Sequence, residues 1–88
     1  MDHKPEWQLI EEIGTYAGLI KVGSSYSHYK DSTKNYTVRE LVIIEGTDEV
    51  GVVYQANFHA KLIFVRPARE WVEEVEWNGT TLPRFQLA

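Results

Sequence analysis

Residues 75–82 read Val-Glu-Trp-Asn-Gly-Thr-Thr-Leu, and this stretch carries the strongest local fold signal in the chain. Asn78-Gly79 favours a type I′ turn, because both residues tolerate the positive φ that this two-residue turn requires. The flanking segments 75–77 and 80–82 contain the β-branched and aromatic residues that suit strands. The sequence therefore predicts a β-hairpin near the C-terminus.

A two-residue periodicity of apolar side chains runs back from this hairpin to about residue 24. It predicts four further strands, at residues 25–30, 36–44, 50–58 and 61–65. The polar stretch Asp31–Asn35 is expected to form a loop, and residues 45–49 a turn. Late in the 36–44 strand both faces are apolar, which indicates a strand that bends or crosses the core.

Pro67 is expected to open a short helix that runs to about Glu73, since its fixed φ suits a first helical turn. Trp71 and Val75, four residues apart, would then point inward, so Trp71 is predicted to anchor the core. Short strands, tight turns and one helix before the last hairpin predict a mainly β fold, a small SH3-like antiparallel barrel. Closing such a sheet removes exposed strand edges.

The first part of the chain has a different pattern. Residues 5–20 show helical spacing of apolar side chains, with Pro5 at the start and acidic residues early. A helix ending near Ile13, followed by a strand at residues 15–22, is an open alternative, because Gly14 and Gly18 weaken a helix. We expect an N-terminal extension over residues 1–22, packed either on the domain at 23–88 or on a second copy of it.

Composition narrows the class of protein. Eighty-eight residues without cysteine form one small domain with no disulfide, thiolate metal site or cysteine nucleophile. The absence of disulfides favours a cytoplasmic location, and no segment is apolar and long enough to span a membrane. A formal net charge of −4 argues against a nucleic-acid partner, whose binding depends on cationic side chains.

A series of short motifs occurs in a fixed order between Tyr26 and Phe85. The motifs are Tyr26-Ser27-His28-Tyr29-Lys30, Tyr36-Thr37-Val38, Val53-Tyr54-Gln55-Ala56, Val65-Arg66-Pro67, Glu73-Glu74-Val75, Gly79 and Pro83-Arg84-Phe85. In this order and spacing the chain resembles the bacterial family called domain of unknown function 1653. The resemblance covers about two-thirds of the chain and implies an SH3-like barrel.

The chain departs from the family pattern at Ile44-Glu45-Gly46-Thr47, where members commonly show a His-Ser-Glu run. An activity that depends on that run would be absent here. The resemblance implies no established activity, so it informs the fold rather than the function.

The candidate ligand site centres on Arg66, with Arg69, His28 and Tyr29 near it. Arg66 would end a strand where a helix begins, and guanidinium groups suit carboxylate or phosphate. A purely structural alternative pairs Arg66 with Glu70 and Arg69 with Glu73, both at four-residue spacing.

These observations predict a binding or interaction module of a bacterial cytoplasmic protein, with a small-molecule, peptide or protein partner. The N-terminal arm offers a surface for a homodimer. We expect no catalytic residue, metal site or cofactor, because the histidines are dispersed and no catalytic motif is present. The alternatives are a small enzyme or accessory subunit that uses His28 and Arg66, and a nucleic-acid-binding domain, which the acidic charge disfavours.

Overall fold

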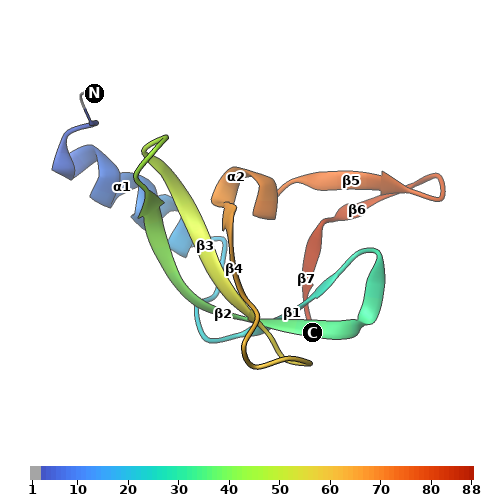
Figure 1. Ribbon diagram of the computed structural model, residues 1–88. Coiled ribbons are helices and arrows are strands. Elements are labelled where there is room, and N and C mark those ends of the chain that lie inside the picture. Colours follow the sequence, from blue (N-terminus) through green and yellow to red (C-terminus); the bar gives the residue numbers. More distant parts are fainter. Residues whose placement is uncertain (1–2) are drawn as a thin grey trace.

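A computed structural model describes residues 3–88, so the first two residues of the predicted extension lie outside it. The protein is mainly β, as predicted, with helices at two places (Figure 1). The elements follow the order α1 (Glu6–Ala17), β1 (Ser25–His28), β2 (Asp31–Ile44), β3 (Glu49–Ala56), β4 (Ile63–Pro67), α2 (Ala68–Trp71), β5 (Glu74–Trp77), β6 (Thr80–Pro83) and β7 (Phe85–Leu87).

The strands form two antiparallel sheets. The larger one has the order β4-β3-β2-β1-β7, and the hairpin β5-β6 forms the smaller one. Among the described residues β4 and β7 are not paired with each other, so the large sheet is open and the predicted closed barrel is not confirmed. The short helix α2 and the hairpin β5-β6 lie between these two edge strands along the chain (Figure 1).

The C-terminal hairpin is confirmed. Asn78 has φ 53° and Gly79 has φ 79°, which are the left-handed conformations that a type I′ turn requires. The turn places Trp77 opposite Thr80 and Val75 opposite Leu82.

The long strand β2 bends where its sequence becomes apolar on both faces. The register with β3 shifts between Val38 and Glu40, which leaves Arg39 as an extra residue in a β-bulge. Before the bulge Val38 is fully buried, and after it Leu41 and Ile43 pack against the core. The bulge explains the two-sided pattern, because it reverses which residues face inward.

Two predicted boundaries are wrong. The expected loop at Asp31–Asn35 belongs to β2. This strand begins at Asp31, directly after a two-residue turn at Tyr29-Lys30. The register jumps from Asn35 opposite Ser27 to Asp31 opposite His28, so residues 32–34 form an insertion within the strand pair. The helix after Pro67 ends at Trp71 rather than near Glu73, and Val75 lies in β5.

The core lies on the inner face of the large sheet. Its buried residues come from the segment after α1, from β1, β2 and β3, from α2 and from β7: Ile20, Tyr26, Val38, Val50, Val52, Tyr54, Ala68, Trp71 and Phe85. Trp71 is 2% exposed, as predicted for a core anchor, and its ring stacks on Phe85 with centroids 3.7 Å apart. This stack ties the C-terminal strand to α2.

The N-terminal arm is helical through Ala17, so the alternative of a strand at residues 15–22 is wrong. Ile13 and Tyr16 pack against the core of their own chain. Asp48 in the β2–β3 turn accepts hydrogen bonds from the His3 ring at 2.5 Å and the Lys4 backbone N–H at 2.7 Å. Within residues 3–88 no helix has the length and apolar character needed to cross a membrane.

Candidate functional site

Arg66 lies on β4 directly opposite Val52, so its side chain starts from the inner face of the sheet. Its guanidinium carbon is 5.7 Å from the centroid of the Phe85 ring, and its Nη1 donates to Glu70 at 3.2 Å. The Nε atom is buried and has no hydrogen-bond partner among the described residues. A buried donor of this kind is costly unless something accepts from it. The Nε–H of Arg66 is therefore an unsatisfied donor on the inner face of the sheet.

The pairing of β1 with β7 brings a second arginine to this place. Phe85 lies opposite His28, and the Tyr29 N–H donates to the Arg84 carbonyl at 3.0 Å. The Arg84 guanidinium lies 6.0 Å from the Tyr29 ring centroid, and its Nε donates to the Glu70 carbonyl at 3.2 Å. Arg66 and Arg84 are thus both fastened to the same residue of α2.

His28 stands among these cations. Its ring meets that of Phe85 at 5.1 Å and that of Tyr29 at 4.5 Å. Partial burial lowers the pKa of His28 below its usual value, and the positive charges of Arg66, Arg84 and Lys30 lower it further. The Lys30 N–H donates to Nδ1 at 3.2 Å, so a neutral His28 carries its proton on Nε2. His28 is therefore a neutral donor in a positive environment.

Tyr36 completes the group from β2. Its ring lies 6.3 Å from that of Phe85, and burial raises the pKa of its hydroxyl, an effect that the nearby Arg66 opposes. We call the set His28, Tyr29, Tyr36, Arg66, Arg84 and Phe85 the Arg66–His28 site. Its two guanidinium groups and aromatic walls suit a carboxylate or phosphate, which guanidinium forks bind in a bidentate manner.

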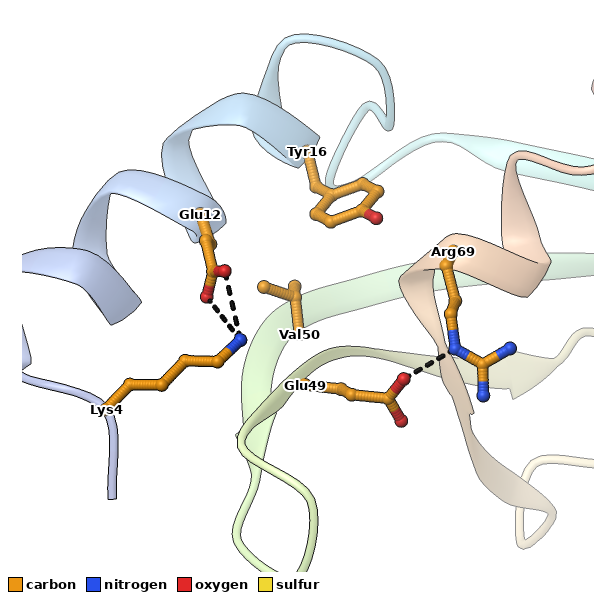
Figure 2. Close-up of a pocket in the computed structure, with 6 residues that line it drawn as sticks. All are labelled: Lys4, Glu12, Tyr16, Glu49, Val50 and Arg69. Atoms are coloured by element: carbon orange, nitrogen blue, oxygen red, sulfur yellow. Dashed lines mark hydrogen bonds and ion pairs between the residues drawn. The ribbon is translucent and has the colours of Figure 1, made fainter. Parts of the chain in front are cut away.

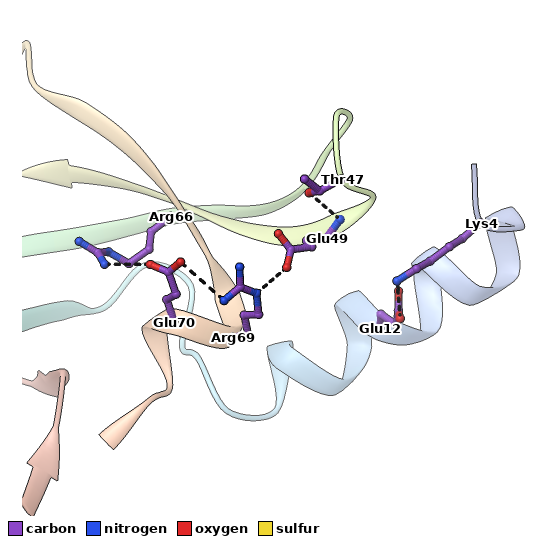
Figure 3. Close-up of polar contacts among 7 residues, drawn as sticks. All are labelled: Lys4, Glu12, Thr47, Glu49, Arg66, Arg69 and Glu70. Atoms are coloured by element: carbon purple, nitrogen blue, oxygen red, sulfur yellow. Dashed lines mark hydrogen bonds and ion pairs between the residues drawn. The ribbon is translucent and has the colours of Figure 1, made fainter. Parts of the chain in front are cut away.

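Arg69 does not join this site. It points away from Arg66 on the other side of Glu70, and its Nε donates to Glu49 at 2.5 Å (Figure 3). Its Nη1 is 3.7 Å from Glu70, so the Glu70 carboxylate stands between the two arginines. Of the two predicted intrahelical pairs, Arg66–Glu70 is confirmed, whereas Glu73 pairs with Arg84 instead of Arg69.

Arg69 lines a different feature, a cavity of about 170 Å³ between α1 and the start of β3 (Figure 2). The charged residues at its wall already have partners: Lys4 pairs with Glu12 at 3.0 Å, and Arg69 pairs with Glu49. Hydrogen bonding from Arg69 holds the pKa of Glu49 below its usual value. The Arg69–Glu49 pair joins α2 to β3, whereas the Lys4–Glu12 pair lies within the N-terminal arm. The charged side chains at this cavity are therefore paired with one another.

The predicted residues His28, Tyr29 and Arg66 thus come together, while Arg69 stands apart. Sequence analysis missed Arg84 and Tyr36 as site residues. Both lie within the motifs that carry the family resemblance, Pro83-Arg84-Phe85 and Tyr36-Thr37-Val38, and that was the signal available. The start of α2 beside Arg66 adds no separate support for an anion, because this helix has only four residues.

The chain is thus a small antiparallel β protein in which two arginines and a histidine surround aromatic rings on the inner face of the sheet. Comparison with family models identifies the family: residues 24–87 match the model described as "Protein of unknown function (DUF1653)". The chain belongs to this family. It is 34% identical to a member from Bordetella bronchiseptica with a crystal structure, at a TM-score of 0.65 over 75% of this chain and 85% of that one. No curated protein matches the chain.

Proposed function

We propose that this chain is a non-catalytic binding module whose ligand presents a carboxylate or phosphate to Arg66. The observation that carries the proposal is the buried, unpartnered Nε of Arg66. A bound oxygen acceptor would satisfy this donor, and Arg84 and the Nε2–H of His28 would supply further contacts.

The same geometry supports binding better than catalysis. In the described part of the chain, His28 accepts one hydrogen bond, from the Lys30 backbone, and no carboxylate holds its ring. A general base is usually oriented by such a partner and stands beside a nucleophile. The alternative of a small enzyme using His28 and Arg66 therefore lacks the supporting groups.

Two broader expectations remain proposals. The curved sheet with α2 between its edge strands is consistent with an opened SH3-like barrel, and we propose that class for the fold. A bacterial cytoplasmic setting agrees with the absence of cysteine from the sequence.

The test is a titration of the ¹⁵N-labelled protein with inorganic phosphate, and separately with acetate, at constant ionic strength. We expect the side-chain Nε–H signal of Arg66 to shift in a saturable way, because that donor gains an acceptor. Backbone signals of His28 and Arg84 should shift with it. Arg66→Gln should abolish the saturable shifts at the other two residues.

Arg69→Gln is the matched control, because Arg69 neighbours the same glutamate but faces the other way. It should leave the phosphate response unchanged. The melting temperature of each variant shows whether it remains folded, and Arg84→Gln provides a second test if Arg66→Gln does not fold. If neither anion moves the Arg66 Nε–H signal at millimolar concentration, the proposal is wrong.

A further inference from the structure

The Arg66–His28 site is the middle of a longer row of aromatic rings. From the hairpin, Trp77 meets Tyr29 with centroids 5.4 Å apart, and Tyr29 meets His28. The row continues from His28 to Phe85 and from Phe85 to Tyr36. Tyr36 then meets Phe58 at 5.4 Å and Phe64 at 6.5 Å. Rings from β5, β1, β7, β2, β4 and the loop after β3 are therefore linked in one continuous row.

Positive side chains accompany the row along its length. Lys30 and Arg84 lie 5.8 and 6.0 Å from the centroid of the Tyr29 ring. Arg66 lies 5.7 Å from that of Phe85. At the far end Lys34 lies 5.2 Å from that of Phe58. We call these rings and the four cations Lys30, Lys34, Arg66 and Arg84 the ring–cation strip.

The outer rings of the strip are open to solvent. Trp77 is 42% exposed, Phe58 48% and Phe64 41%, whereas Phe85 in the middle is buried. Large exposed rings at both ends of a partly buried cationic centre are not needed by the core. Proteins that bind single-stranded nucleic acid combine exposed rings, on which bases stack, with cations, which pair with phosphates.

We propose that the ring–cation strip binds single-stranded nucleic acid, with a phosphate at Arg66 and Arg84 and bases against Trp77 and Phe58. This inference rests on the proposed anion site and names its ligand. An acidic peptide would use the same cations but would leave the exposed rings without a role.

The net charge of −4 is unevenly distributed, but carboxylates also stand on the strip, where Glu70 pairs with Arg66 and Glu73 pairs with Arg84, so a bound phosphate would have to displace them. Several carboxylates lie on α1 and around the β2–β3 turn, at the opposite end of the molecule from the β1–β2 turn (Figure 1): Glu6, Glu11, Glu12, Glu45, Asp48 and Glu49. The charges that act on the pKa of His28 are those of Arg66, Arg84 and Lys30, and all three lower it. For this reason we expect the strip to bind nucleic acid with modest affinity and only at low salt.

The experiment measures the fluorescence anisotropy of a labelled oligothymidylate of about eight nucleotides, within the site sizes of small β domains. We expect saturable binding at low salt. If all four cations neutralise phosphates, the slope of log affinity against log salt should be about −3, since each contact on a single strand contributes about −0.7.

Matched variants separate the strip from the rest of the surface. Trp77→Ala should weaken binding about five-fold or more, because stacking of one base on a ring is lost. Trp7→Ala is its control, an exposed tryptophan on α1 away from the strip. Lys34→Gln should reduce the salt slope by about 0.7, and Lys21→Gln, at an exposed lysine outside the strip, should not change it.

Absence of binding at low salt would overturn the inference, as would equal effects of Trp77→Ala and Trp7→Ala. Binding of an oligoglutamate but not of the oligonucleotide would replace it with an acidic peptide partner. In both cases the phosphate titration of Arg66 reports separately whether the underlying anion site exists. Failure of this inference is thereby distinguished from failure of the proposed function.

Discussion

Glu70 occupies the guanidinium group that the proposed ligand would use, so replacing it should strengthen anion binding. Its carboxylate lies 3.2 Å from Nη1 of Arg66 and 3.7 Å from Nη1 of Arg69. When an anion approaches Arg66, this carboxylate, which lies between the two arginines, must yield part of its contact with Arg66 (Figure 3). Glu70 is an internal competitor for the site.

The expected gain in phosphate affinity depends on how far the Arg66–Glu70 ion pair is exposed to solvent. The side chains of Arg66 and Glu70 are 29% and 34% exposed, so solvent screens the pair, and such pairs contribute about 0.2–1 kcal/mol. Glu70→Gln also removes a negative charge that repels the ligand, which in water is worth about 1 kcal/mol at 4 Å. Together these terms amount to about 1.2–2 kcal/mol and predict phosphate binding that is tighter by roughly 8- to 30-fold. The free energy of unfolding should fall by no more than about 1 kcal/mol.

The assay is the phosphate titration of the ¹⁵N-labelled variant, with the dissociation constant taken from the backbone signals of His28 and Arg84. Glu12→Gln is the matched control, because it removes the same charge from an ion pair of similar exposure at the distant cavity. Phosphate affinity that is unchanged or weaker in Glu70→Gln would refute the reasoning that Glu70 competes for Arg66.

Three further predictions concern the fold. Trp71→Ala should lower the free energy of unfolding by about 3–5 kcal/mol, measured by urea denaturation, because a buried, stacked ring is lost; unchanged stability would contradict its role as anchor. Gly51→Ala should cost about 1–3 kcal/mol in the same assay, because the new Cβ would stand 2.8 Å from Cγ1 of Ile44; a neutral effect would show that the sheet relaxes there. A hydrogen bond to Asp48 raises the pKa of His3 above its usual 6.5, so this tether of the arm is complete below pH 6.5 and is lost as pH rises through the raised pKa. Amide exchange in α1 should accordingly speed up beyond its intrinsic pH dependence over that range, and Asp48→Asn should remove this extra acceleration.

Features that depend on neighbours in sequence were predictable. The hairpin follows from the two residues Asn78-Gly79, and the N-terminal helix from the spacing of its apolar side chains. The bend of β2 was visible as a change of the inward-facing residues, although its cause, the bulge at Arg39, was not. Burial of Trp71 was predicted from a helical pairing with Val75, but α2 ends at Trp71, and the rings packed on it are those of Phe85, Tyr54 and Tyr26.

Features that depend on long-range pairing were not predictable in the same way. The opposite directions of Arg66 and Arg69 arise because Glu49, twenty residues before Arg69, supplies its partner. The insertion at residues 32–34 has the polar composition of a loop, and only the pairing of Asp31 with His28 shows that the strand starts earlier. Local composition alone does not distinguish a loop from a bulged strand.

Phe85 on the C-terminal strand contacts both the core and the residues of the Arg66–His28 site, so the fold and the geometry of the site depend on the same ring. Trp71 stacks on the Phe85 ring, His28 meets it at 5.1 Å, and the Arg66 guanidinium lies 5.7 Å from its centroid. Removing Phe85 would therefore disrupt the core and the site together. A loss of binding could then not be assigned to one of these two causes. The Arg66–His28 site is tested at its half-exposed rim instead, where Arg84 and Glu70 contact each other through one side-chain-to-carbonyl hydrogen bond. Because those side chains carry charge rather than core volume, their replacement changes affinity for an anion while leaving the packing that positions Arg66 in place.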